Sequence, residues 1–213
     1  MTVTDVNVVK SAIFERPDDA NKGTLGSLLC VCGSYGMAGA AVMSAKGALR
    51  TGIGLAKCAL PRSIYPIVAQ TILESVYYPL SENADGRISK VNVPFLVSES
   101  CKSSATLVGC GLGVCDDTLK IVFSFIENST TPLVLDADAL NCVAKQPEIL
   151  LRKKAPIIIT PHPGEMSRLT GLATPLVNAE RERVALDFAQ KYGVVTVLKG
   201  AGTVIASPNG KVL

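Results

Sequence analysis

The sequence has 213 residues, with 21 Lys and Arg against 18 Asp and Glu, a hydrophobic fraction of 48% and a mean hydropathy of +0.35. This length predicts one domain, residues 1–213, with a sizeable core. No apolar run reaches the roughly 20 residues of a membrane helix, the amino terminus lacks the pattern of a secretory signal, and the one basic run, 152–154, has no interleaved aromatic residues for base stacking. We therefore expect a cytoplasmic protein that binds neither membranes nor nucleic acid.

The seven cysteines are odd in number and sit mostly inside apolar runs. Their spacing matches neither a disulfide framework nor a paired Cys-x-x-Cys zinc site. We expect reduced thiols in the core at all seven positions: Cys30, Cys32, Cys58, Cys101, Cys110, Cys115 and Cys142.

The first glycine-rich turn follows a predicted leader of helix and loop over residues 1–22 and a short apolar strand over 28–32. The turn spans 33–39 and opens a helix over 40–51 whose many small residues allow close approach to a sheet or a ligand. Its glycines are spaced three apart and not as G-x-G-x-x-G. The turn suits a phosphate, but a plain strand-to-helix turn is the favoured interpretation.

The second glycine-rich turn lies at residues 109–113, after a series of predicted strands and helices. Before it we predict, in order, a strand over 53–60, a helix over 63–71, a strand over 74–78, a polar stretch over 81–90, a helix over 93–102 and a strand over 105–108. Three alternate glycines then occupy 109–113 and leave their backbone N–H groups open to an anion or a planar ring. Asp116 and Asp117 begin a helix that runs to about residue 128.

Two carboxylates and an amide follow the strand predicted over 132–135, as Asp136, Asp138 and Asn141. Such groups at the end of a buried strand are costly to desolvate unless they bind something, such as a hydrated magnesium ion or a ligand hydroxyl. The alternative is helix capping. It explains Asp138 as well as ligand binding does, but it explains Asp136 less well.

The stretch 156–171 holds the only histidine of the chain. Residues 157–159 are an unbroken isoleucine run, which is typical of a parallel strand buried on both faces. Thr160, His162 and Glu165 follow, and a helical pattern resumes at 166–169. Ligands of open α/β sheets bind just outside the carboxyl ends of strands, so we expect a small-molecule site here. Taken alone, His162 is also explained as an ordinary loop histidine.

The last part of the chain also places a polar residue directly after a predicted strand. A helix is predicted from 174 to the glycine at 193, then a strand over 194–198, then a hairpin that begins at 203–206 and turns at 208–210. Lys199 stands beside open glycine backbone and suits a phosphate, although a solvated turn lysine is the alternative. Five strands thus end in glycine or polar residues. A parallel sheet flanked by helices brings these ends to one edge: Gly33, Gly109, Asp136, Thr160 and Lys199.

The ordered set of segments resembles one family, the ADP- or ATP-dependent NAD(P)H-hydrate dehydratases, which have the ribokinase-like fold. The matching segments are KGTLG at 22–26, GSYGMAGAA at 33–41, ALRTGIGLAK at 48–57, VGCGLG at 108–113, LDADALN at 135–141, TPHPGEMSRLTG at 160–171 and VLKGAGTVIASPNG at 197–210. The resemblance implies an α/β, three-layer α/β/α architecture with a mostly parallel central sheet. It also implies a magnesium-dependent lyase that uses ADP or ATP to restore NADH or NADPH from its 6-hydroxy form, and a homotetramer.

The resemblance also assigns residues by position. The hydrated dinucleotide would be contacted by Ala40 or Ala41, Gly111, Asp136, Asn141 and His162. The adenosine phosphate would lie on Lys199, Gly200, Ala201, Gly202 and Thr203. Glu165 would hold magnesium through water, as the acid of the fold's usual Asn-x-x-Glu motif, with His162 where the asparagine would stand.

One expected segment is missing from the sequence. The family continues into a Gly-x-Gly-Asp segment that supplies a catalytic base and an anion hole, and these would lie beyond Leu213. We expect either a truncated chain or a short paralogue that binds nucleotide without turnover, and we favour truncation because a break inside a hairpin leaves an unpaired edge. The alternative functions are a ribokinase-like kinase of a small alcohol, against which the His-Pro-Gly-Glu segment argues, and a non-catalytic nucleotide-binding protein. The sequence does not distinguish ADP from ATP.

Overall fold

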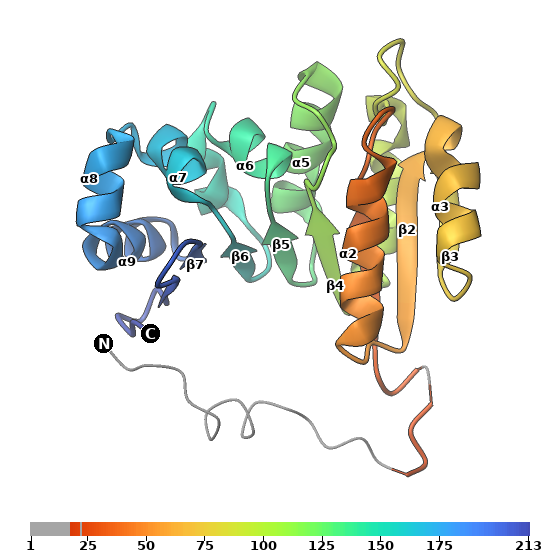
Figure 1. The fold of residues 1–213 in the computed structure, drawn as a ribbon, viewed down its shortest axis with the longest axis horizontal. Coiled ribbons are helices and arrows are strands. Elements are labelled where there is room, and N and C mark those ends of the chain that lie inside the picture. The colour runs from red at the N-terminus through yellow and green to blue at the C-terminus, as the bar shows by residue number, and fades with distance from the viewer. Residues whose placement is uncertain (1–17, 22) are drawn as a thin grey trace.

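The computed structural model of the chain describes residues 18–21 and 23–213, so most of the predicted leader lies outside the described residues. Its centre is one eight-stranded sheet with the order β3-β2-β1-β4-β5-β6-β7-β8 (Figure 1). The strands are β1 (Ser27–Val31), β2 (Leu55–Pro61), β3 (Val76–Leu80), β4 (Ala105–Val108), β5 (Leu133–Leu135), β6 (Ile157–Ile159), β7 (Val195–Leu198) and β8 (Val204–Ala206).

Strands β1 to β7 are parallel, and β8 pairs antiparallel with β7. The predicted mostly parallel sheet and the terminal hairpin are therefore confirmed. The chain runs outward from β1 through β2 to β3 and then returns to place β4 on the other side of β1. This reversal makes the β1/β4 junction a topological switch point, where the loops after neighbouring strands diverge and leave a crevice.

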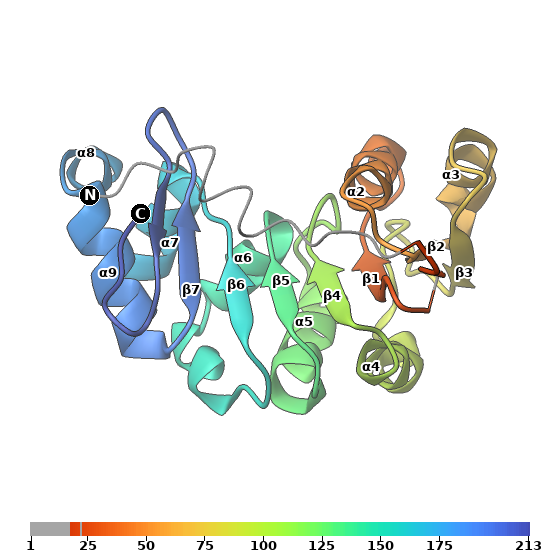
Figure 2. The same ribbon diagram turned by 90° about the horizontal axis from the view of Figure 1, so that it is seen from below.

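Helices lie on both faces of the sheet, in three layers (Figure 2). On one face, α2 (Ala38–Arg50) and α3 (Tyr65–Thr71) pack over β1, β2 and β3. The remaining helices contribute to a core on the other face: α4 (Val93–Cys101), α5 (Asp116–Asn128), α6 (Asp138–Val143), α7 (Pro163–Thr170), α8 (Thr174–Ala179) and α9 (Arg181–Tyr192). Short 3-10 turns are η1 (Arg62–Ile64), η2 (Lys90–Asn92) and η3 (Pro147–Arg152). No helix in the described part of the chain is long and apolar enough to cross a membrane.

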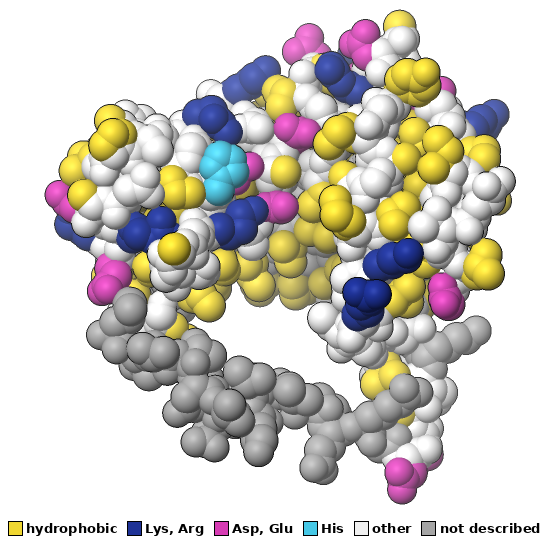
Figure 3. Space-filling model, viewed as in Figure 1, with side chains coloured by type: hydrophobic (Ala, Val, Ile, Leu, Met, Phe, Trp, Pro, Cys, Tyr) yellow, Lys and Arg dark blue, Asp and Glu magenta, His cyan; other side chains and the backbone are white. Residues whose placement is uncertain are grey.

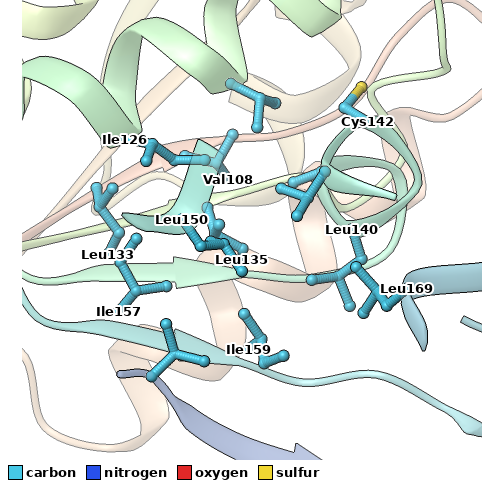
Figure 4. Close-up of a cluster of buried hydrophobic side chains, with 14 of the residues drawn as sticks. Val108, Ile126, Leu133, Leu135, Leu140, Cys142, Leu150, Ile157, Ile159 and Leu169 are labelled. Atoms are coloured by element: carbon cyan, nitrogen blue, oxygen red, sulfur yellow. The ribbon is translucent and has the colours of Figure 1, made fainter. Parts of the chain in front are cut away.

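The strands divide the buried side chains between two cores, because successive residues of a strand point to opposite faces. In β1, Leu29 and Val31 enter the larger core, part of which Figure 4 shows, and Cys30 enters the smaller core beneath α2 and α3. Ala41 and Ala45 of α2 are buried there. The small side chains of this helix therefore do allow the close approach to the sheet that the sequence predicts.

The sheet is covered unevenly. Ile157 and Ile159 of β6 are buried in the larger core, but Ile158 between them is 36% exposed. The prediction that this strand is buried on both faces is therefore wrong for the described residues. The reason is that α2 and α3 cover chiefly the β1–β3 part of their face, and no other described helix lies over β5 and β6 on that side (Figure 2).

Three further predictions need correction. Strands β2 and β3 begin two residues later than predicted, and β3 includes Pro79, which is tolerated because β3 is the edge strand. The single helix predicted from residue 174 is two helices, because Glu180 between them has the non-helical angles φ −125° and ψ 42°. All seven cysteines are free, as predicted, but Cys101 is exposed and Cys110 and Cys115 are only partly buried.

Candidate functional site

The loops after β1 and β4 meet against the first turn of α2. The backbone N–H of Gly33 donates to Cys110 O at 2.8 Å, and the buried Ser34 Oγ donates to Gly111 O at 2.8 Å. A Cβ atom on Gly111 would lie 2.7 Å from the Cβ of Ala40, and the φ of Gly111 is +70°. The Ala41 side chain instead faces the smaller core below Gly33. Of the two predicted alanines, only Ala40 therefore has its side chain at the sheet edge, beside Gly111.

Asp136 joins the ends of four strands. Its Oδ1 accepts hydrogen bonds from Lys199 Nζ at 2.6 Å and from Thr160 Oγ1 at 2.7 Å, and its Oδ2 accepts a weaker one from Cys110 Sγ at 3.4 Å. Burial raises the pKa of the Asp136 carboxyl, but the bonds from Lys199 and Thr160 outweigh burial and hold this pKa below its ordinary value. The predicted meeting of strand ends at one edge is confirmed. Lys199, predicted as a phosphate contact, is held here by a carboxylate.

Asp138 and Asn141 fasten the second glycine turn to α6 and α7. Asp138 Oδ2 accepts the backbone N–H of Gly113 at 2.8 Å, and Asp138 Oδ1 accepts Asn141 Nδ2 at 3.3 Å. Asn141 Oδ1 in turn accepts Arg168 Nε at 2.8 Å. The N-cap of α6 is Ala137, and no side chain caps this helix. The capping interpretation of Asp138 is therefore wrong, because its carboxylate is used to hold the neighbouring loop.

The backbone is most strained where the ends of β4 and β5 approach each other, between Asp136 and Asp138. Ala137 has φ +52°, a left-handed value that is costly for a residue with a side chain. Across from it, a Cβ atom on Gly109 would lie only 1.8 Å from Asp136 O. Glycine is therefore required at 109 for the β4 and β5 ends to approach each other, and this approach helps to place Asp136 beside Cys110.

His162 and Glu165 form a reciprocal cap at the start of α7. His162 Nδ1 accepts the backbone N–H groups of Gly164 at 3.0 Å and Glu165 at 3.4 Å, and Glu165 Oε2 accepts the backbone N–H of His162 at 2.8 Å. The Glu165 side chain is 7% exposed, whereas that of His162 is 52% exposed with Nε2 3.4 Å from Glu165 Oε1. Our sequence analysis missed this cap. The signal was the spacing of three between a cap residue and a glutamate at a helix start.

The loop between β7 and β8, residues 199–203, is exposed beyond Lys199. Thr203 Oγ1 donates to Gly200 O at 3.1 Å and shapes the turn. Among the residues that the structure describes, the backbone N–H groups of Ala201, Gly202 and Thr203 have no hydrogen-bond acceptor. Three adjacent free N–H donors with a lysine at their base can bind an anion.

A groove of about 560 Å³ lies between α2 and the part of the sheet that no described helix covers on this face, and Lys199 lines it. Its walls are mostly apolar, and Cys110, Asp136, Thr160 and Lys199 contribute the polar end. Figure 3 shows a hydrophobic hollow on this face, bordered by basic and acidic side chains. A second cavity of about 570 Å³ lies between η3, α7 and α9 and contains none of the predicted site residues.

Comparison with known proteins identifies the family. A family model described as NAD(P)H-hydrate dehydratase matches residues 28–213. The chain therefore belongs to the NAD(P)H-hydrate dehydratase family. It is 39% identical over 196 residues to a bifunctional NAD(P)H-hydrate repair enzyme Nnr of Thermofilum pendens, which covers 92% of this chain and 37% of that protein. The chain spans less than two fifths of the length of this relative.

Solved structures show the same fold. The crystal structure of the ADP/ATP-dependent NAD(P)H-hydrate dehydratase of Bacillus subtilis, co-crystallised with ATP and Mg²⁺, has a TM-score of 0.79 and 29% identity, covering 97% of this chain and 69% of that one. A ribokinase-like superfamily protein of Enterococcus faecalis has a TM-score of 0.77 at 20% identity, covering 94% of this chain and 66% of that one. The predicted ribokinase-like three-layer fold is therefore confirmed.

Proposed function

We propose that the protein dehydrates the hydrated forms of NADH and NADPH in a reaction that consumes ADP or ATP. The observation that carries this proposal is the contact between Lys199 and Asp136, which joins two candidate binding regions at one sheet edge. One is the close contact between Ala40 and Gly111 at the ends of β1 and β4, and the other is the loop 199–203. The family match and the co-crystallisation of the Bacillus subtilis relative with ATP and Mg²⁺ support the proposed reaction.

In the proposed reaction the terminal phosphoryl group of the nucleotide passes to the ring hydroxyl. The new oxygen–phosphorus bond forms while the bond from phosphorus to the nucleotide's bridging oxygen breaks, and the hydroxyl proton is released. The carbon–oxygen bond then breaks, inorganic phosphate leaves with the bonding electrons, and loss of a proton from the adjacent ring carbon restores the double bond. Such transfers depend chiefly on positioning and on neutralising charge.

The residues of this chain supply the positioning. The free N–H groups at 201–203 bind the nucleotide phosphates, with Lys199 as the counter-charge. At the other end, the hydrated ring lies against the small residues Ala40 and Gly111, which are packed closely together, and the exposed face of His162 contacts the dinucleotide. Asn141 lies behind this region and is held by Asp138 and Arg168.

No group of three or more His, Cys, Asp or Glu side chains gathers among the described residues, so the proposed magnesium ion would have few protein ligands at this edge. The ion takes hard oxygen ligands and commonly binds one or two carboxylates while keeping several waters. Asp136 offers Oδ2, whose one recorded donor is the weak thiol of Cys110. Both oxygens of the buried Glu165 face His162, so this carboxylate would contact the ion only through water. When bound, magnesium would neutralise the charge of the transferring phosphoryl group.

We assign no catalytic base in this chain. Among the described residues at the edge, the Asp136 carboxylate is held by Lys199 and Thr160, and the Asp138 carboxylate is held by Gly113 and Asn141. Both carboxylates therefore hold structural contacts, and the less engaged oxygen, Asp136 Oδ2, is the one proposed above for magnesium. The choice between ADP and ATP, the homotetramer and the cytoplasmic location remain predictions.

The test is to incubate hydrated NADH with magnesium and ADP or ATP, and to follow the return of the dihydronicotinamide absorbance. The 213-residue chain and, as a positive control, the Bacillus subtilis dehydratase should be assayed side by side, with binding of each ligand measured by calorimetry. We expect the chain to bind both ligands and to restore NADH. Binding of nucleotide by the chain with no restoration of NADH would favour a non-catalytic nucleotide-binding protein, and a stable phosphorylated product would favour a small-alcohol kinase.

A further inference from the structure

The loop 199–203 is held from below by Arg181, a residue that our sequence analysis did not single out. Arg181 Nη2 donates to Leu198 O at 2.8 Å, and Arg181 Nε donates to Gly202 O at 3.3 Å. Leu198 is the last residue of β7, and Gly202 lies on the far side of the loop. One planar guanidinium thus connects the two ends of the loop, which a lysine ammonium on a flexible stem does not reproduce.

The position of Arg181 in its own helix argues for this role. Arg181 is the first residue of α9, where the helix dipole disfavours a positive charge. Arg183, two residues on, pairs with Glu180 and with Asp187 within the same helical region. Arg181 has no such carboxylate partner among the described residues, and its recorded acceptors are two backbone carbonyls and Asn178 Oδ1. Its charge therefore serves the loop and not the helix.

The contact also fixes the shape of the loop. A Cβ atom on Gly200 would lie 2.9 Å from Arg181 Nη2, so the guanidinium fills the space on the inner side of Gly200. With the carbonyls of Leu198 and Gly202 drawn toward Arg181, the intervening N–H groups of Ala201 and Gly202 are left without protein acceptors in the described part of the chain. These are the groups that an anion would use.

We propose that Arg181 is a positioning residue for the nucleotide phosphates. It acts through the backbone of 199–203, holding the donors of this loop in place before the nucleotide arrives, and it does not contact the ligand. This inference rests on the proposed function, because it assumes that the loop binds ADP or ATP.

The test compares Arg181→Gln and Arg181→Lys with the matched control Arg183→Gln on the same helix. Calorimetry should measure the Kd of each variant for ADP and ATP with magnesium, and separately for NADPH as a probe of the region around Ala40 and Gly111. Thermal unfolding should be recorded for each. We expect Arg181→Gln to weaken nucleotide binding by about tenfold or more, since loss of pre-organised donors is costly, and to leave the Kd for NADPH unchanged. The nucleotide Kd of Arg181→Lys should lie between those of the unmodified chain and Arg181→Gln. The nucleotide Kd of Arg183→Gln should equal that of the unmodified chain.

The outcomes separate the two proposals. If the unmodified chain binds neither ADP nor ATP, the nucleotide part of the proposed function fails and this inference fails with it. If the unmodified chain binds nucleotide and Arg181→Gln binds it equally well, only the positioning role is overturned. A parallel loss of nucleotide and NADPH binding would also overturn it, because that pattern indicates general loss of structure. Arg181→Lys, which keeps the charge and the aliphatic stem, maintains the test if the glutamine variant folds poorly.

Discussion

The two ends of the sheet edge are built by different physical means. At the β1/β4 end, Ala40, Gly109 and Gly111 bring backbone segments together because they have little or no side chain. At the β5–β7 end, Asp136, Thr160 and Lys199 are held together by charge and hydrogen bonding. The first end should therefore be sensitive to added atoms and the second to altered charge. Each of the following changes tests one side of this difference.

The largest effect is expected for Gly109→Ala. The added Cβ would lie 1.8 Å from Asp136 O and 2.8 Å from the Cβ of Ala139, at a φ of +129°. Strain and overpacking together should lower the free energy of unfolding by roughly 3 kcal/mol or more, measured by urea denaturation. Gly47→Ala is the control, because its Cβ would meet nothing within 4 Å and alanine stabilises a helix by about 0.5–1 kcal/mol. Equal urea midpoints for the two variants would contradict the steric account.

Lys199→Met should have the largest effect at the charged end. Methionine keeps most of the unbranched side chain but removes the cation from Asp136 and, in our proposal, from the nucleotide phosphates. We expect at least about a tenfold loss of ADP and ATP affinity by calorimetry and a loss of about 1 kcal/mol of stability, small because Lys199 is partly exposed. Lys120→Met, at an exposed position of α5, is the control. Unchanged nucleotide affinity in Lys199→Met would show that its only partner is Asp136.

His162 can be separated into a cap and a ligand contact. His162→Ala removes the acceptor for the Gly164 and Glu165 N–H groups and should cost about 1 kcal/mol in thermal or urea unfolding. His162→Asn supplies another good cap and should recover most of that stability. Both variants should weaken binding of the hydrated dinucleotide if the exposed imidazole face contacts it. If His162→Asn binds the dinucleotide as well as the unmodified chain does, the histidine is a cap alone.

Acid stability should report the Asp136 cluster. The folded-state pKa of Asp136 lies below its ordinary value of 3.8, so its contribution to stability is present above that value and is lost as pH falls through the folded-state pKa. Urea unfolding between about pH 6 and pH 3 should therefore show a smaller pH dependence for Asp136→Asn than for the unmodified chain. An identical pH dependence would show that Lys199 and Thr160 do not stabilise the ionised carboxylate.

The sequence predicted the sheet edge because its signals are local. Residues such as Gly33, Asp136 and Lys199 each stand directly after an apolar run, and parallel strands bring such positions together whatever their order. The strand order, with its switch between β1 and β4, depends on crossovers that no single segment encodes. The pairing of Asp136 with Lys199 spans 63 residues and likewise leaves no local pattern.

Some features that our sequence analysis did not predict nevertheless have a recognisable sequence pattern. The His162–Glu165 cap follows the three-residue spacing of a capping box, with histidine as an unusual cap residue. Arg181 is the first residue of α9, where the helix dipole disfavours a cation. This pattern can be recognised only once the helix break at Glu180 is known. The exposure of Ile158 has no sequence signal, because an apolar run reads the same whether or not a helix covers the strand.

The most direct test of the account is a crystal structure of the chain with ADP, magnesium and NADPH. The account predicts the nucleotide phosphates within hydrogen-bond distance of the N–H groups at 201–203 and of Lys199, and the nicotinamide ring at Gly111 and His162. It also predicts that Arg181 keeps its bonds to Leu198 and Gly202. Phosphates bound elsewhere, for example in the cavity between α7 and α9, would contradict the division of the sheet edge into a nucleotide end and a dinucleotide end.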